Sequence, residues 1–353
     1  MSVELGLIEG FYGRPWSWPE RTATITFLAG HGFRFYLYAP KGDAFLRRRW
    51  QEPYPAADAE QLTQLAAHCR SHGVRFGVGL SPYDACRDFD GATRAALAGK
   101  LAFLAEVGAS DVAILFDDMR GDVPRLAERQ VELVHFAAGR SSARLQMCPS
   151  YYSDDPLLDR LFGARPEGYL RTLGTLLDPA IDIFWTGEEI CAREHSTAHL
   201  ERVALELGRR PLLWDNYPVN DTPRMSQHLH LRGFTGRPAA LAGVISAHGI
   251  NGALQPTLTH IPALTLVESY ALGAAYAYGA ATRRAAAAVL GEPLATVLHE
   301  DLALLQDVGR DRLGARAPEL RERYAGARHA GAREILRWLD GEYQVSDELI
   351  RSQ

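Results

Sequence analysis

Short apolar runs recur along this chain at intervals of about 30 to 40 residues, roughly the length of one strand-plus-helix unit. The runs carry no helical period, and most of them are rich in branched aliphatic or aromatic side chains, which predicts buried strands. Helical spacing between them is clearest at residues 57–72, 93–107 and 123–138. Strand and helix alternating eight times predict an α/β fold, a (β/α)8 TIM barrel. The predicted strands are residues 5–8, 35–38, 75–79, 112–116, 145–148, 181–185, 211–214 and 242–245.

The pattern changes near residue 273, beyond which no further strand is predicted. Residues 281–288 and 294–308 have helical character, and 319–339 form a charged stretch with apolar residues at helical spacing. We therefore predict a barrel at residues 1–272, followed by a small helical appendage at 273–353.

Composition adds little beyond excluding some functions. The 353 residues are 47% hydrophobic and 23% charged, with a formal net charge of −5. No basic stripe is interleaved with aromatic residues, which argues against nucleic acid as a partner. The start of the chain has no signal-peptide pattern, and the most apolar segment, 264–289, is broken by Glu268 and Arg283-Arg284. We expect no membrane span.

The four cysteines form no CxxC pair; they are Cys69, Cys86, Cys148 and Cys191. This scatter argues against a disulfide framework or a zinc site and favours a reducing, cytoplasmic environment.

Polar residues follow each predicted strand, where barrel enzymes assemble their active sites. They include Glu9 to Tyr12, Lys41, Tyr83, Asp117-Asp118, Tyr151-Tyr152, Glu188, Asp215-Asn216 and His248 to Asn251.

Asp117 and Asp118 are the most informative of these, because they directly follow the apolar run 112–116. They could be a helix cap with a spare carboxylate, a metal site or an acid/base pair. No other carboxylate cluster has metal-ligand spacing. As an acid/base pair, their like charges would push one pKa upward. The strand must also end or twist there, because successive strand residues face opposite sides.

Six short motifs lie at the ends of predicted strands. They are EGFYGRPW from Glu9, YAPK from Tyr38, FDDM from Phe116, CPSYY from Cys148, FWTG from Phe184 and WDNYPVND from Trp214. Together and in this order they resemble glycoside hydrolase family 84, which contains O-GlcNAcases and bacterial β-N-acetylglucosaminidases. The resemblance covers about residues 5–272.

The resemblance implies a retaining exo-β-N-acetylglucosaminidase without metal or cofactor. The substrate would be a terminal β-linked N-acetylglucosamine (GlcNAc) on a glycoconjugate, including serine or threonine of a glycosylated protein. In such enzymes the sugar's own 2-acetamido oxygen attacks C1 and forms an oxazoline. By resemblance, Asp117 orients the acetamido group and Asp118 is the general acid/base.

The resemblance also implies a sugar pocket. Asn216 would bond the acetamido group, Tyr152 its oxygen, and Trp214 would form the pocket wall. Asp221 would bind O4 and O6, and Lys41 would reach the O3 side. Taken singly, these two and Asn216 could instead be surface or turn residues.

Gly10 would contribute its carbonyl, and Asn251 would bond O4 or O6. The family has an Asn-Pro dipeptide at the position of Asn251, whereas in this chain Gly252 follows Asn251.

Two other functions stay open at this stage. One is a GlcNAc-binding barrel without turnover. The other is a metal-dependent barrel hydrolase, which usually has His-x-His where this chain has Glu9-Gly10-Phe11. The stretch 319–339 could complete a partner's site in a homodimer or, as we favour, pack on its own chain.

Overall fold

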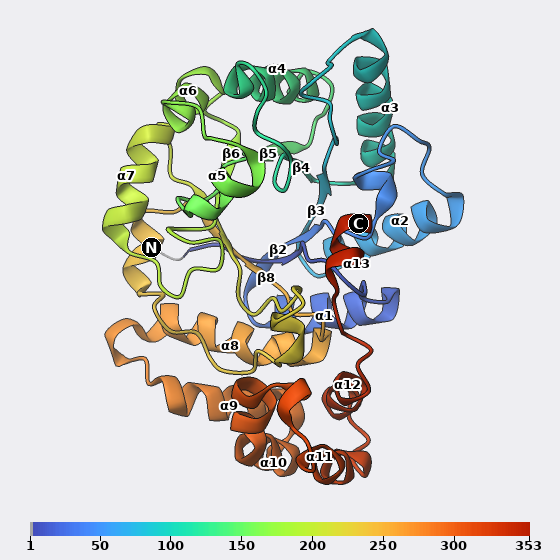
Figure 1. Cartoon of the computed structure of the whole chain (residues 1–353), viewed down its shortest axis with the longest axis vertical. Coiled ribbons are helices and arrows are strands. Elements are labelled where there is room, and N and C mark those ends of the chain that lie inside the picture. Colours follow the sequence, from blue (N-terminus) through green and yellow to red (C-terminus); the bar gives the residue numbers. More distant parts are fainter. Residues whose placement is uncertain (1–2) are drawn as a thin grey trace.

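A computed structural model describes residues 3–353 as a barrel with helices around it and a helical region at one side (Figure 1). Parallel strands β1 to β8 pair in chain order and close β8 onto β1. This confirms the predicted TIM barrel. The strands are β1 (Leu5–Glu9), β2 (Phe33–Tyr38), β3 (Arg75–Leu80), β4 (Asp111–Leu115), β5 (Arg144–Cys148), β6 (Asp182–Trp185), β7 (Leu212–Asp215) and β8 (Ala247–Asn251).

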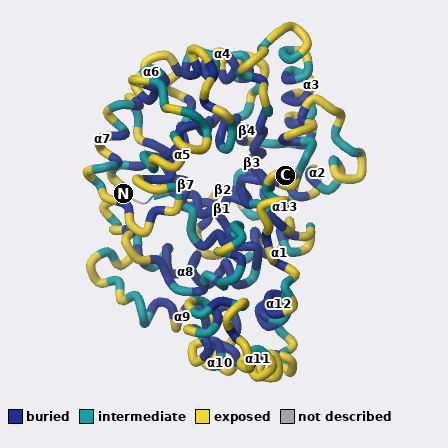
Figure 2. Tube along the Cα trace, in the orientation of Figure 1, coloured by how far each residue is buried: buried dark blue, intermediate teal, exposed yellow. Residues whose placement is uncertain are grey.

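The helices that follow the strands cover the outside of the barrel. Figure 2 shows the strands as a buried centre and the helices with exposed outer faces. Ser17 begins the first helix with a capping box, since its side chain and that of Glu20 satisfy each other's backbone N–H. The helices are α1 (Trp18–Gly30), α2 (Ala56–Ser71), α3 (Gly91–Val107), α4 (Leu126–Ala138), α5 (Pro156–Phe162), α6 (Tyr169–Leu176), α7 (Thr197–Leu207) and α8 (Pro256–Leu272).

The eighth strand is not where the apolar pattern predicted it. Residues 239–243 form a 3-10 helix, and the strand begins at Ala247. Its sequence, AHGIN, contains few apolar residues, yet all five are buried. His248 forms a hydrogen bond with Asp215 inside the barrel. A Cβ on Gly249 would lie 2.6 Å from Ile8 Cδ1. Because its burial depends on these specific contacts, hydropathy gave no signal for it.

The remaining helices are α9 (Tyr278–Leu290), α10 (Glu292–Leu302), α11 (Arg316–Ala325), α12 (Ala330–Leu339) and α13 (Asp347–Ser352). The predicted single stretch 319–339 is two helices, because Gly326 ends α11 and His329 caps α12. α12 packs on α8 of its own chain, and α13 returns to the barrel (Figure 1). The division at residues 272 and 273 stays a prediction.

Glu334 joins α12 to the barrel and provides the first testable prediction. Its carboxylate accepts hydrogen bonds from the backbone N–H groups of Thr257 and Leu258, each at 2.9 Å, at the start of α8. Glu334→Ala leaves both donors unpaired, so we expect it to lower the free energy of unfolding at pH 5 by about 2 kcal/mol. Chemical denaturation, with the exposed Glu322→Ala as control, measures this loss.

The effect of Glu334 should also depend on pH. Burial raises the pKa of Glu334 from 4.5 to about 7. Because the folded-state pKa lies above the unfolded value, the stabilisation that Glu334 contributes is fully present below about pH 4.5 and is lost as the pH rises through 7. The difference in unfolding free energy between wild type and Glu334→Ala should therefore become smaller as the pH rises over this range. A difference that widens would contradict this account.

Candidate functional site

The paired aspartates lie at the carboxyl end of the barrel. β4 ends at Leu115, and Asp118 has a φ of 57°, in the left-handed region that aspartate tolerates better than most residues. This turn lets both carboxylates line one pocket, as the sequence reasoning required. The pocket has a volume of about 730 Å³, within the range of ligand sites.

All nine site residues predicted from the sequence line this same pocket. The site and the role of each residue in it stay predictions. They are Gly10, Lys41, Asp117, Asp118, Tyr152, Trp214, Asn216, Asp221 and Asn251.

Three side chains surround the two carboxylates. Lys41 is buried and forms an ion pair with Asp117, and its Nζ lies 3.6 Å from Asp118 Oδ2. The hydroxyls of Tyr12 and Tyr152 donate to Asp118 at 2.9 and 3.1 Å. Lys41 and Tyr152, predicted to contact the sugar, therefore contact the carboxylates in the free site.

The pKa of Asp118 is lowered, although the like charges of the pair were expected to push one pKa upward. Burial alone would raise the pKa of Asp118, but Lys41, Arg47 and the two tyrosine hydroxyls outweigh it and lower this pKa. Asp221 is a pocket carboxylate whose pKa is raised. It reaches about 6 because Asp221 is buried and faces the charge of Asp118. The sequence placed Lys41 in the site, but it indicated neither the contact of Lys41 with the carboxylates nor the presence of Arg47.

Asp117 Oδ1 is a buried acceptor without a donor. Within residues 3–353 this atom has no hydrogen-bond partner, while Oδ2 pairs with Lys41. Leaving such an acceptor unpaired costs about 1–3 kcal/mol. An N–H group brought by a ligand would remove this cost.

The opposite wall is a connected set of side chains. Asn216 Oδ1 accepts from Trp214 Nε1 at 3.1 Å and from Asn251 Nδ2 at 3.0 Å. Asn251 Oδ1 in turn accepts from the Gly10 N–H at 3.1 Å. A Cβ on Gly10 would lie 2.3 Å from the Trp214 ring, so only glycine fits there. Gly252, which replaces the family's proline, leaves Asn251 on this wall.

Beneath this wall lies a buried ion pair. Asp215 accepts from Arg237 Nε at 2.8 Å and Nη2 at 2.6 Å, and its Oδ2 lies 3.0 Å from His248 Nε2. Burial alone would raise the pKa of Asp215, but Arg237 and His195 hold it well below its usual range. Since Asn216 follows Asp215 directly, this pair fixes the backbone that presents Asn216.

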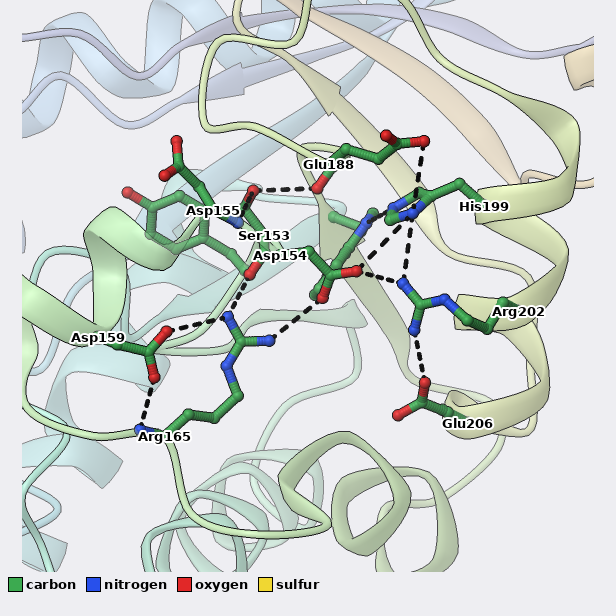
Figure 3. A network of polar contacts seen from close by, with 12 residues as sticks. Ser153, Asp154, Asp155, Asp159, Arg165, Glu188, His199, Arg202 and Glu206 are labelled. Carbon is green, nitrogen blue, oxygen red and sulfur yellow. Dashed lines mark hydrogen bonds and ion pairs between the residues drawn. The ribbon is translucent and has the colours of Figure 1, made fainter.

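A second polar network holds the loops after β5 and β6 together (Figure 3). Asp154 contacts Arg165 and Arg202, and the Ser153 hydroxyl donates to the Gly187 carbonyl. Asp155 accepts from the N–H groups of Leu157 and Ile190 and so joins α5 to the loop after β6. These contacts fix the backbone next to Tyr152.

Other pocket residues were not predicted as site residues from the sequence, and four of them show why. Tyr12 lies within the first motif, and that position was a usable signal. Arg47 belongs to a run of three arginines that is typical of a surface. Ile350 and Arg351 lie on α13, more than 200 residues beyond the aspartates, and no local pattern connects them to the pocket.

Two features are absent from the described residues. Residues 3–353 contain no cluster of three or more His, Cys, Asp or Glu side chains able to hold a metal ion. Among the same residues, no helix is long and apolar enough to cross a membrane.

Comparison with known proteins agrees with this geometry. Residues 5–306 match the family model described as beta-N-acetylglucosaminidase. The chain is 30% identical over 247 residues to the protein O-GlcNAcases of Mus musculus and Rattus norvegicus. The match covers 67% of this chain and 26% of each relative, so the chain spans about a quarter of their length.

Two solved structures have the same fold. A variant of the Thermobaculum terrenum O-GlcNAc hydrolase superposes with a TM-score of 0.78 at 26% identity, covering 96% of this chain and 80% of that one. CpGH84B superposes with a TM-score of 0.74 at 22% identity, covering 96% and 66%. The match to the family model spans all eight strands and every pocket residue except Ile350 and Arg351 of α13. The chain therefore belongs to the β-N-acetylglucosaminidase family, glycoside hydrolase family 84.

Proposed function

We propose that the protein is a retaining β-N-acetylglucosaminidase that removes terminal β-linked GlcNAc, including from serine or threonine of proteins. Family membership supports the reaction class. The observation that carries the mechanism is Asp117, a buried carboxylate with one acceptor atom still unpaired within residues 3–353. The acetamido N–H of GlcNAc is the donor that would fill this place.

In the first step, the acetamido oxygen attacks C1 as the bond from C1 to the leaving oxygen breaks. Asp118 gives its proton to that oxygen. Positive charge then spreads onto the acetamido nitrogen, and Asp117 stabilises it at close range. In the second step, water attacks C1, the bond from C1 to the acetamido oxygen breaks, and Asp118 takes a proton from the water, so the product keeps the β configuration.

The lowered pKa of Asp118 constrains when it acquires its proton. In the free site Lys41 and Arg47 favour the charged form. A bound sugar excludes water from the pocket, and desolvation raises a carboxyl pKa. We therefore propose that Asp118 is protonated in the complex with substrate.

Asp221 gives a prediction about pH. Its pKa of about 6 means that it is neutral below this pH and charged above it. If the charged form accepts hydrogen bonds from sugar hydroxyls, kcat/KM should fall as the pH drops below about 6. Asp221→Asn should lower kcat/KM and remove this acidic limb from the profile. A variant that keeps the limb unchanged would assign it to another group.

The experiment for the proposed function is hydrolysis of an aryl β-N-acetylglucosaminide in the presence of EDTA, beside the matching aryl β-glucoside. We expect turnover of the first and almost none of the second, which lacks the acetamido nucleophile. Equal turnover of both, or loss of activity with EDTA, would overturn the mechanism. Tight GlcNAc binding without turnover would favour the binding barrel instead.

For the compartment, we propose the reducing cytoplasm. All four cysteines are free within the described residues, including the buried Cys69 and Cys148.

A further inference from the structure

The outer part of the pocket is built by two helices that the mechanism does not use. On one side, Leu157 and Leu161 of α5 line the pocket, although they are 37% and 58% exposed. On the other side, Ile350 and Arg351 of α13 line it. Exposed leucines at the entrance of a pocket form a surface that an apolar group of a ligand can contact.

α13 is fixed to the barrel beside the catalytic residues. The Gln353 side chain accepts from the Gly13 N–H at 2.8 Å and donates to the Gly13 carbonyl at 3.2 Å. Arg47 Nε donates to the Gln353 main-chain oxygen at 3.1 Å, and Arg48 Nη2 to that of Arg351 at 2.8 Å. The helix is therefore part of the pocket wall.

Three arginines line this side of the pocket. Within residues 3–353, Arg47, Arg48 and Arg351 form no ion pair, although all three line the pocket. Arg47 is buried, and its Nη1 has no hydrogen-bond partner among the described residues. The charge of Arg47 acts on Asp118, whose pKa it helps to lower, so Arg48 and Arg351 are the two charges that favour an anion from outside the chain.

The carboxylates at the outer pocket do not neutralise this group. Asp155 is occupied by backbone N–H groups at the start of α5. Glu189, exposed on the loop after β6, forms no ion pair within the described residues. The outer pocket thus has an apolar wall on α5 and a basic one at α13.

We propose that this outer pocket binds a peptide aglycone with an acidic side chain close to the glycosylated serine or threonine. The inference rests on the proposed function and names its substrate class. Arg48 and Arg351 would face the acidic side chain, and Leu157 and Leu161 an apolar one. Leucines fit peptide side chains better than a second sugar ring, which is usually bound by polar groups and aromatic faces.

The test compares two synthetic glycopeptides of equal length that carry one β-GlcNAc on serine. One has Asp and Glu beside the serine, and the other has Asn and Gln there. For wild type at low salt we expect kcat/KM for the acidic peptide to be about fivefold higher, as two partly exposed ion pairs would give. This preference should shrink in high salt.

The double variant Arg48→Gln/Arg351→Gln should bring the ratio of the two kcat/KM values to about one. A ratio within each variant cancels any general loss of activity. The matched control is Arg328→Gln, an exposed arginine between α11 and α12, which should keep the wild-type ratio.

An aryl β-N-acetylglucosaminide, assayed in parallel, separates the two proposals. No aryl turnover by wild type would overturn the proposed function. Aryl turnover with equal rates on both peptides, or a preference that survives the double variant, would overturn only the acidic-peptide inference. Cleavage of a GlcNAc disaccharide bearing a carboxylate, with neither peptide cleaved, would also overturn it.

Discussion

Asp118→Asn is expected to slow hydrolysis of a substrate with a poor leaving group, such as an alkyl β-N-acetylglucosaminide, by about 10²- to 10⁴-fold. Asparagine keeps the size of the side chain and can accept from Tyr12 or Tyr152, but it cannot transfer a proton. An activated aryl leaving group departs with little acid assistance, so its first step should be slowed far less. The measurement is kcat/KM for a series of leaving groups.

The slope of log kcat/KM against leaving-group pKa is the informative quantity. It should be shallow for wild type and steep for Asp118→Asn. Asp122→Asn, an exposed aspartate four residues further on, provides the control and should keep the wild-type slope. An equal loss of kcat/KM on every substrate would contradict the role of Asp118 as the general acid. It would indicate that Asp118 acts only through its charge.

The second large effect is on stability. Arg237→Met is expected to lower the free energy of unfolding by about 3–5 kcal/mol, because it leaves the fully buried Asp215 without its main cation. Methionine fills much of the space but cannot replace the donors to the Asp215 carboxylate or to the Ala192 carbonyl. Chemical denaturation measures the loss.

Two further variants make this prediction specific. Arg202→Met removes a partly exposed arginine from the network in Figure 3 and should cost less than about 1 kcal/mol. The double variant Asp215→Asn/Arg237→Met removes the buried charge as well. Its loss of unfolding free energy should therefore be smaller than the sum of the losses of the two single variants. An additive double variant would mean that the two side chains act independently.

The sequence was sufficient for the barrel because parallel strands buried on both faces must be apolar. The runs at residues 112–116 and 211–214 are examples. It failed at β8, where burial depends on one hydrogen-bonded histidine and a glycine that makes room for Ile8. The pattern also missed the break between α11 and α12, because Gly326 interrupts a helical spacing that resumes in phase.

The site could be predicted wherever its residues sit in a motif next to a strand end. Asp117, Asp118 and Asn216 are such residues, and all of them line the pocket. Electrostatics could not be predicted in the same way. The pKa of Asp118 depends on burial and on Lys41 and Arg47, which come from elsewhere in the chain, and these two cations lower it. α13 was missed because only tertiary packing brings it to the pocket.

The most direct test of the central claim compares one aryl β-N-acetylglucosaminide with its N-trifluoroacetyl analogue, using the wild-type protein. The fluorines withdraw electrons from the acetamido oxygen and leave the leaving group unchanged. If this oxygen is the nucleophile, kcat/KM should fall by about 10²-fold or more, which corresponds to about 3 kcal/mol in the barrier. Equal rates on the two substrates would contradict the account and require a nucleophile supplied by the protein.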